Sequence, residues 1–157
     1  MVRIAIQKSG RLNQSSLALI KSCGISIDNR KDQLKANAKN FPMEVFYLRN
    51  GDIPQYMRDG VVDLAIIGEN LLAEKGKNLE VIEQLGFSRC KVSIAVPKNT
   101  KFNDIKDLEG KRIATSYPNT VNAFLQANQI KADSIEGMSL HWSPNEETLR
   151  QLEQLGV

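Results

Sequence analysis

The sequence predicts an α/β fold, and three observations support this class. Short strand-like runs recur at residues 2–6, 44–48, 61–67 and 111–114. Segments with apolar residues at helical spacing follow these runs, after short loops that contain glycine or hydroxyl residues. The run at residues 61–67 is almost continuously apolar, which is typical of a parallel strand covered on both faces. Strands and helices that alternate in this way predict a sheet with helices packed against it.

The predicted elements of the first half have their own start and stop signals. Residues 2–6 are rich in β-branched side chains and predict a strand, and the apolar spacing that follows predicts a helix that ends before Gly24. Residues 44–48 predict a second strand. Asp52 is placed to cap a helix that Gly60 ends, and the apolar run then begins. The first half is therefore expected to hold three strands and two helices between them.

The second half continues this pattern after a polar break. Residues 90–97 alternate between apolar and other side chains, and the turn-rich stretch at residues 98–107 marks the expected boundary between two lobes. Residues 111–114 predict a strand, and residues 116–118 open a helix. A capping box predicts a last helix over residues 143–155, with leucines along one side and glycine at its end.

The composition is that of a globular protein with a core of its own. The chain has 157 residues, of which 41% are hydrophobic and 25% charged, and this excludes a disordered chain. Cys23 and Cys90 have neither metal-binding nor disulfide spacing and indicate a reducing compartment. The start of the chain carries no signal peptide or membrane span, so a cytoplasmic protein without a membrane partner is expected.

The charge pattern does not indicate a nucleic-acid partner. The net charge of +3 comes from 21 basic and 18 acidic residues and suits an anionic ligand, while a solvated surface of mixed charge is the more common reason for such a balance. The basic residues between positions 98 and 112 alternate with acidic ones. A nucleic-acid surface needs clustered positive charge, so no nucleic-acid partner is predicted.

Two loops that follow strands of the first half are candidate binding sites. Free backbone N–H groups at the start of a helix attract anions, and glycine lets a ligand approach the backbone closely. Residues 8–11 form the first loop, a Lys-Ser-Gly-Arg sequence that adds two cations to this field. Residues 68–70 form the second, in the position where open α/β sheets gather ligands. A solvated turn at the first loop, and a plain turn capped by Asn70 at the second, are the alternatives.

The third candidate loop covers residues 115–117 and opens the helix of the second half. Its hydroxyl groups and the amides of the helix start are suited to a phosphate or a ribose. Capping of the helix by Thr115 or Ser116 is the structural alternative.

Other catalytic arrangements are not indicated. His141 is the sole histidine, and no nucleophile motif such as G-x-S-x-G accompanies it. Asp59 and Asp63 lie on either side of Gly60 and do not share a helical face, so a structural or solvated role is expected for both. No catalytic side-chain nucleophile is predicted.

Four segments of the chain resemble a known family: RIAIQKSGRL, DIPQYMRDGVVDLAIIGEN, GFSRCKVSIAVP and GKRIATSYPN. In this order and spacing, residues 1 to about 138 resemble the N-terminal part of ATP phosphoribosyltransferase, the first enzyme of histidine biosynthesis. The QKSGRL form of the first segment resembles the long form of that family. The resemblance implies a two-lobed fold like that of type II periplasmic binding proteins, with substrates in the cleft between the lobes.

The resemblance also implies a reaction and its ligands. The family joins N1 of the adenine of ATP to C1 of phosphoribosyl pyrophosphate and expels pyrophosphate, with Mg²⁺ assistance. Both substrates are polyanions, so charge neutralisation and alignment matter more than a nucleophile. ATP or AMP and phosphoribosyl pyrophosphate are therefore the implied ligands, and a homo-oligomer is the implied assembly, with no metal ligand assigned.

The implied substrate-binding residues come from the three candidate loops. Those on the nucleotide side are Lys8, Ser9, Gly10, Arg11, Leu12, Glu69 and Asn70. Those expected to face them from the second lobe are Thr115, Ser116 and Tyr117.

The resemblance divides the chain into a first α/β lobe over residues 1–97 on the nucleotide side, a partial second lobe over 98–138 and a divergent C-terminal helix over 139–157. After Gly137 the family continues toward a loop that binds the phosphoribosyl 5′-phosphate, and this chain departs from that pattern. The second lobe and the return strands are therefore expected to be incomplete, and the activity impaired. Asn50 and Gly51 also replace residues that are usually acidic in the family.

Three origins fit the divergent end: a truncated or frameshifted product, a foreign appended end, and a stand-alone variant. The alternative function is a non-catalytic module on the same fold that binds a nucleotide or another small molecule, or acts as a subunit.

Overall fold

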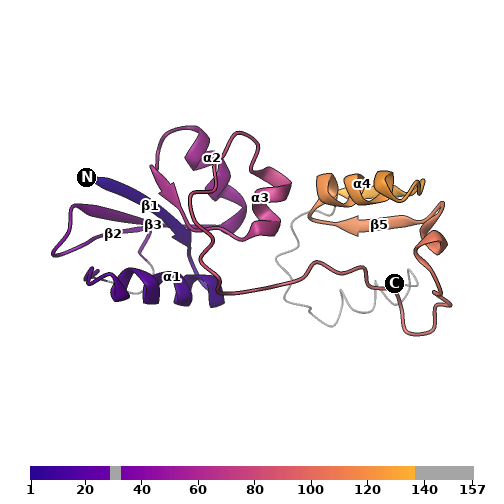
Figure 1. Ribbon diagram of the computed structural model, residues 1–157, viewed down its shortest axis with the longest axis horizontal. Coiled ribbons are helices and arrows are strands. Elements are labelled where there is room, and N and C mark those ends of the chain that lie inside the picture. Colours follow the sequence, from indigo (N-terminus) through magenta and orange to yellow (C-terminus); the bar gives the residue numbers. More distant parts are fainter. Residues whose placement is uncertain (29–32, 137–157) are drawn as a thin grey trace. The chain divides into compact units, whose positions relative to one another are not determined.

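The computed structural model describes residues 1–28 and 33–136 and separates into two compact units, Met1–Lys91 and a second that begins at Val92 (Figure 1). The division falls ahead of the boundary expected after Pro97. The first unit contains β1 (Val2–Gln7), α1 (Arg11–Ser22), β2 (Lys35–Asn37), β3 (Met43–Leu48), the 3₁₀ turn η1 (Asn50–Asp52), α2 (Ile53–Arg58), β4 (Leu64–Ala65) and α3 (Glu69–Lys75). The second contains the 3₁₀ turn η2 (Ile105–Leu108), β5 (Arg112–Thr115), α4 (Pro118–Ala127) and β6 (Asp133–Glu136). Both units are mixed α/β.

Strand β1 lies inside a four-stranded sheet with the order β2-β3-β1-β4. It runs parallel to β3 along its whole length, from Val2 opposite Met43 to Gln7 opposite Leu48, and it is also parallel to β4. Strand β2 pairs antiparallel with β3. The strands predicted at residues 2–6 and 44–48 and the helices after them are confirmed. Strand β2 was missed because its Lys-Ala-Asn sequence carries no strand signal.

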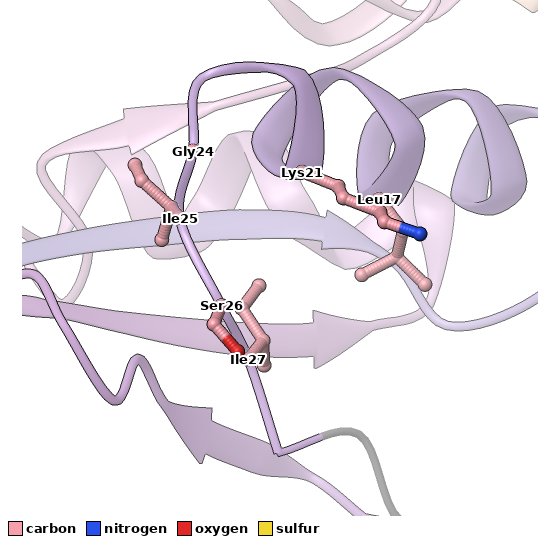
Figure 2. Close-up of a pocket in the computed structure, with 6 residues that line it drawn as sticks. All are labelled: Leu17, Lys21, Gly24, Ile25, Ser26 and Ile27. Carbon is pink, nitrogen blue, oxygen red and sulfur yellow. The ribbon is translucent and has the colours of Figure 1, made fainter.

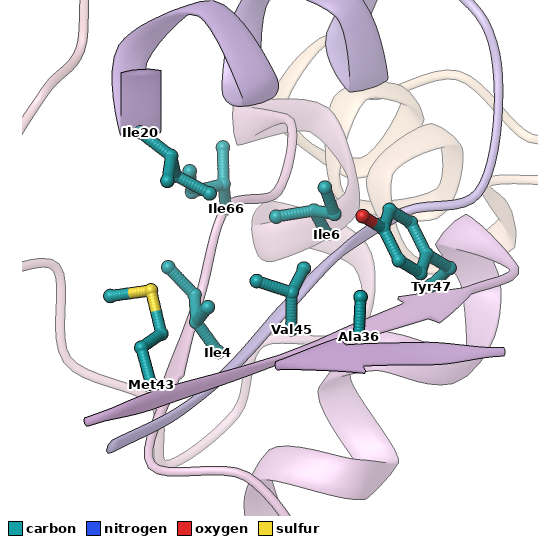
Figure 3. Packing of buried hydrophobic residues seen from close by; sticks show 8 residues of the cluster. All are labelled: Ile4, Ile6, Ile20, Ala36, Met43, Val45, Tyr47 and Ile66. Carbon is teal, nitrogen blue, oxygen red and sulfur yellow. The ribbon is translucent and has the colours of Figure 1, made fainter. Parts of the chain in front are cut away.

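Successive side chains of β1 and β3 point to opposite faces of the sheet, and each face has its own core. The larger cluster lies on the face that α1 covers and consists of Ile4, Ile6, Ile20, Ala36, Met43, Val45, Tyr47 and Ile66 (Figure 3). On the other face, Ala5 packs with Ile53 of α2 and with Val62. Helices α1 and α2 therefore cover opposite faces of one sheet, which sets the position of the loops at its edge.

The apolar run at residues 61–67 forms a shorter and more exposed strand than predicted. Only Leu64 and Ala65 belong to β4, which pairs with β1 and forms an edge of the sheet. Val61 and Leu64 are 38% and 37% exposed. The run still contributes to the core on each face of the sheet, with Ile66 in the larger cluster and Val62 in the smaller one. The predicted burial on both faces is therefore confirmed at these two residues and not at Val61 and Leu64.

The second unit is one β-α-β motif with a small core. β5 and β6 run parallel, with Arg112 opposite Asp133, and α4 connects them. Its buried residues are Leu108, Leu125 and Ile130. The predicted strand at residues 111–114 and the helix predicted to open at residues 116–118 are confirmed, with α4 beginning at Pro118.

Two further expectations concern residues that form no regular structure or that lie outside the described ranges. Residues 90–97 form neither helix nor strand. The helix predicted over residues 143–155 and His141 lie outside the described residues. In the ranges that the structure does describe, no helix is both long and apolar enough to cross a membrane.

Candidate functional site

The order of the parallel strands defines the most favourable ligand position in the first unit. The chain passes from β1 to β3 on one side, and then from β3 to β4 on the other side of β1. The connecting helices α1 and α2 lie on opposite faces. In open α/β sheets, ligands bind at the carboxyl ends of the strands where such a change of direction occurs. Here this point lies between the carboxyl ends of β1 and β4, so the predicted loops at residues 8–11 and 68–70 flank it.

Backbone and side-chain hydrogen bonds hold the first loop in place. The backbone N–H of Lys8 donates to the carbonyl of Leu48 at 2.8 Å, which ties the loop to the end of β3. The Asn13 side-chain amide donates to the carbonyl of Gln7 at 2.7 Å, which ties α1 back to β1. Between these ties, Gly10 has a φ of 87° and a ψ of −173°, a conformation that is essentially restricted to glycine. The loop is therefore a fixed structure and not a loose connection.

The same loop presents an uncapped and positively charged helix start. Gly10 is the N-cap of α1, no side chain caps the helix, and no acidic residue lies in its first turn. Lys8 and Arg11 are exposed, and neither forms an ion pair with a residue in the described ranges. The free amides, the helix dipole and two cations together favour an anion at this point.

The second loop leads from β4 into α3. The backbone N–H of Ile66 donates to the carbonyl of Ala5 at 2.9 Å, so pairing with β1 continues beyond the strand. Gly68 is the N-cap of α3, and Asn70 lies inside the helix, so the alternative of Asn70 as the helix cap is wrong. A Cβ atom at position 68 would lie 2.5 Å from Oδ1 of Asn70. Glycine at this position therefore allows the Asn70 side chain to approach the backbone of residue 68. Glu69 is exposed next to it.

The third loop belongs to the second unit and precedes α4. The backbone N–H of Tyr117 donates to Oγ1 of Thr115 at 2.9 Å, and Pro118 occupies the first turn of the helix. Tyr117, and not Thr115 or Ser116, is the N-cap residue. The Thr115 oxygen is therefore used to shape the turn, while the Ser116 side chain is exposed.

The loop after β3 reaches the same edge of the sheet and was not predicted as part of the site. Oδ1 of Asn50 is buried and has no hydrogen-bond partner among the residues that the structure describes. A Cβ atom on Gly51 would lie 3.9 Å from Nζ of Lys75, which places the end of α3 next to this loop. The sequence does contain one indication of this loop, because residues 49–52 follow a predicted strand directly. Asn13, which ties the first loop to β1, was also missed.

Acidic residues do not gather in the described ranges. These ranges contain no group of three or more His, Cys, Asp or Glu side chains that could hold a metal ion. Asp63 forms an ion pair with Arg3 at the opposite, amino end of the strands, and Asp59 accepts a hydrogen bond from Gln55 at 2.7 Å. These contacts agree with the structural or solvated role predicted for the two aspartates.

A cavity of about 430 Å³ lies at the other end of α1 (Figure 2). Its lining residues are Leu17, Lys21, Gly24, Ile25, Ser26 and Ile27. Lys21 is separated from Arg11 by about 15 Å along the helix, given the rise of an α-helix. The cavity is therefore separate from the predicted loops.

Comparison with known proteins relates the chain to one family. The profile of HisG, described as ATP phosphoribosyltransferase, matches residues 49–138. The ATP phosphoribosyltransferase of Cytophaga hutchinsonii is 51% identical over 132 residues, which are 84% of this chain and 46% of that protein. The enzyme of Parabacteroides distasonis is 44% identical over 133 residues, or 85% of this chain and 47% of that protein. The chain thus spans about half the length of the curated relatives that it matches.

A solved structure has a similar fold. The ATP phosphoribosyl transferase (HisG:HisZ) complex from Thermotoga maritima matches with a TM-score of 0.61 and 23% identity, covering 98% of this chain and 78% of that one. At this identity the match supports the α/β fold.

Proposed function

This chain belongs to the ATP phosphoribosyltransferase family, and we propose that the carboxyl edge of its first sheet binds the nucleotide of that family's reaction. The observation that carries the proposal is the uncapped start of α1 at the carboxyl end of β1, with Gly10 at its N-cap and two exposed cations beside it that pair with no residue in the described ranges. A nucleotide phosphate meets free amides and positive charge there. We assign the nucleotide side to Lys8, Ser9, Gly10, Arg11, Leu12, Glu69 and Asn70.

The proposed reaction joins N1 of the adenine of ATP to C1 of phosphoribosyl pyrophosphate, and pyrophosphate leaves with the electrons of the broken C–O bond. We propose that Thr115, Ser116 and Tyr117 contact the substrates from a second lobe, in a two-lobed arrangement like that of type II periplasmic binding proteins. The lobes proposed for the chain are residues 1–97 and 98–138. The exposed Ser116 hydroxyl supports this assignment, since it is able to donate to a phosphate or ribose oxygen.

Mg²⁺ belongs to the proposal as an ion carried by the substrates. Mg²⁺ in phosphate-transfer sites is commonly held by phosphate oxygens and water, together with one or two carboxylates. The described residues form no metal cluster. Glu69, exposed at the start of α3, is the carboxylate of the proposed site. We further propose a homo-oligomer in the cytoplasm as the working state.

This chain is expected to retain nucleotide binding while its catalytic activity is impaired. The nucleotide loops are present, whereas the residues after Gly137 depart from the pattern that binds the phosphoribosyl 5′-phosphate. We therefore expect weak binding of ATP or AMP and a turnover far below that of a full-length relative. Titration calorimetry with ATP and AMP, together with pyrophosphate release from ATP and phosphoribosyl pyrophosphate, tests both parts.

The outcomes of this experiment are distinct. Nucleotide binding that is lost in Lys8→Ala, with turnover far below that of the Cytophaga hutchinsonii enzyme, supports the proposal. Absence of nucleotide binding contradicts the assigned site. Robust pyrophosphate release that is abolished by Lys8→Ala contradicts the proposed impairment and leaves the site assignment standing.

A further inference from the structure

Asn50 is the only asparagine in the sequence that is followed by glycine. The backbone nitrogen that follows an asparagine is able to attack the carbonyl carbon of the asparagine side chain, and a bulky following residue hinders this attack. Glycine has no Cβ atom and has access to the widest range of backbone conformations, so it hinders the attack least. The Asn50–Gly51 bond is therefore the position in this sequence where such a ring closure is most favoured.

The structure leaves both reacting groups without a hydrogen bond. The backbone N–H of Gly51 donates to no residue in the described ranges, and the Asn50 side-chain amide has no partner in these ranges either. A hydrogen bond on either group would have to break before the two atoms could react, and no such cost arises here. Gly51 is also exposed, so water reaches the bond.

The Asp59–Gly60 bond shows the opposite arrangement. The backbone N–H of Gly60 donates to the carbonyl of Met57 at 3.1 Å, and Oδ1 of Asp59 accepts a hydrogen bond from Gln55 at 2.7 Å. A carboxylate is also a poorer target for a nucleophile than a neutral amide. Asp59 therefore serves as an internal reference for ring closure before a glycine.

Only a short turn holds Asn50 in its conformation. The 3₁₀ turn η1 is closed by the N–H of Asp52, which donates to the carbonyl of Arg49 at 3.0 Å, and by the N–H of Ile53, which donates to the carbonyl of Asn50. Hydrogen bonds in 3₁₀ turns have poor geometry, and exposed loops open locally at a low free-energy cost. Opening of the turn allows the backbone of Asn50 to rotate, which brings the Gly51 nitrogen to the side-chain carbon.

We propose that Asn50 is a site of spontaneous deamidation. The Gly51 nitrogen loses its proton to water and bonds to Cγ of Asn50, while the bond between Cγ and Nδ2 breaks and Nδ2 takes up a proton and leaves as ammonia. Water then adds to either carbonyl carbon of the resulting succinimide ring. The ring opens to aspartate or to isoaspartate, in which the backbone passes through the side chain. Water is the only co-reactant, and nothing is oxidised or reduced.

Both products change the carboxyl edge of the first sheet. Nζ of Lys75 lies 3.9 Å from the place of a Cβ atom on Gly51, so a carboxylate at position 50 is added close to this cation. Isoaspartate also lengthens the backbone directly ahead of Ile53, which is fully buried. We therefore expect the aspartate product to weaken binding of an anion at this edge, which rests on the proposed function, and the isoaspartate product to destabilise the first unit. The modification itself depends on residues 49–53 and not on the nucleotide site.

Mass spectrometry of the full chain, incubated at neutral pH, tests the modification. Cleavage after glutamate releases residues 45–69, in which Asn50 is the only asparagine. This fragment should gain the mass that exchange of NH₂ for OH produces, about tenfold faster than any other asparagine of the chain, because only Asn50 precedes glycine. A protein-isoaspartate methyltransferase with a labelled methyl donor should mark isoaspartate at position 50 and not at Asp59.

Gly51→Ala is the matched control. A Cβ atom at position 51 meets only Nζ of Lys75, at an ordinary contact distance, so the variant should fold as the unmodified chain does. Its conversion at Asn50 should be about tenfold slower, because the added Cβ atom hinders the attack. The proposal is overturned if Asn50 reacts no faster than the other asparagines, if Gly51→Ala reacts equally fast, or if conversion occurs only after the chain is unfolded in urea.

Calorimetry with ATP tests the consequence separately. Asn50→Asp carries the charge of the product, and Asn50→Gln keeps a neutral amide. Asn50→Asp should bind ATP about threefold more weakly than Asn50→Gln, because the added charge repels the phosphates. Equal affinities would overturn this consequence. If none of the chains binds ATP, the proposed nucleotide site is wrong, whereas the mass change at Asn50 still supports the modification.

Discussion

Arg3 and Asp63 hold the amino ends of β1 and β4 together through four hydrogen bonds. Nη2 of Arg3 lies 2.7 Å from Oδ1 of Asp63, and Nε and the backbone N of Arg3 lie 3.1 Å and 2.8 Å from Oδ2. The backbone N–H of Asp63 returns a bond to the Arg3 carbonyl at 2.8 Å. Since β4 is short, this pair supplies much of the polar contact that fixes it against β1.

The pair predicts an acid-dependent loss of stability. The hydrogen bonds from the Arg3 side chain and backbone lower the pKa of Asp63 from 3.8 to about 2. Because this pKa is lower in the folded state than in the unfolded state, the stabilisation is present above about pH 4 and is lost as the pH falls toward about 2. Asp63→Asn should lower the free energy of unfolding at neutral pH and flatten its decline between these values. Urea titrations between pH 2 and pH 7 measure the free energy of unfolding of both proteins. The prediction is contradicted if that free energy declines with falling pH as steeply in Asp63→Asn as in the unmodified chain.

Arg11→Ala should weaken nucleotide binding and spare the fold. Arg11 is exposed, with no ion pair or hydrogen bond from its side chain to a described residue. Loss of a hydrogen bond to a charged phosphate costs about 1.5–3 kcal/mol, and calorimetry with ATP measures it.

Arg58→Ala is the matched control for Arg11→Ala. The Arg58 guanidinium donates to the carbonyl of Lys75 at 2.7 Å and to the side chain of Gln55 at 2.8 Å, so it stabilises the end of α3. This variant should lower the melting temperature and retain nucleotide affinity. If Arg11→Ala instead lowers the melting temperature without changing affinity, Arg11 is a structural residue.

Gly10→Ala should damage both the loop and binding. The cost comes from the backbone and not from a clash, because a Cβ atom there would meet Nε2 of Gln7 at an ordinary 3.6 Å. A residue with a side chain in this conformation costs about 1–3 kcal/mol. Gly24→Ala is the control, because Gly24 also has a positive φ and open space but lies after the end of α1. Both variants should lose stability, and loss of ATP affinity is expected for Gly10→Ala alone; equal affinities would contradict the assigned loop.

Much of the first unit could be predicted because its signals are local. The β-branched run that forms β1, the apolar spacing of α1 and the glycine after that helix are all visible in short stretches of sequence. The loop after β1 could be predicted for the same reason. The loop after β3 also follows a predicted strand directly, but its place at the same edge as the other loops depends on which strands are neighbours, and strand order is a long-range property.

Two details depend on the packing around a residue and not on its own preference. The apolar run at residues 61–67 indicates burial on both faces, and Ile66 and Val62 are buried on opposite faces, whereas Leu64, in a strand at the edge of the sheet, is 37% exposed. The alternative of a helix cap at Asn70 came from residue preference. In the structure the N-cap is Gly68. A Cβ atom on this residue would lie only 2.5 Å from Oδ1 of Asn70, so the Asn70 side chain occupies space that any other residue at position 68 would need. Side-chain preference does not encode such a close approach.

A pair of substitutions in the third loop separates a structural hydroxyl from a ligand-binding one. Oγ1 of Thr115 accepts the backbone N–H of Tyr117 at 2.9 Å, and this bond orients the turn into α4. Thr115→Val keeps the shape of the side chain and removes the acceptor, which should lower the stability of the second unit by about 0.5–1.5 kcal/mol. Ser116 is exposed and its side chain does not cap α4, so Ser116→Ala should leave the unfolding curve unchanged.

Because we place the Ser116 hydroxyl against the substrates, the same variant should reduce the affinity for phosphoribosyl pyrophosphate, or for ATP if the loop contacts the nucleotide. Chemical denaturation and calorimetry measure the two effects separately. Unchanged affinity for both substrates in Ser116→Ala would remove this loop from the proposed site, and its contribution would then be limited to the start of α4.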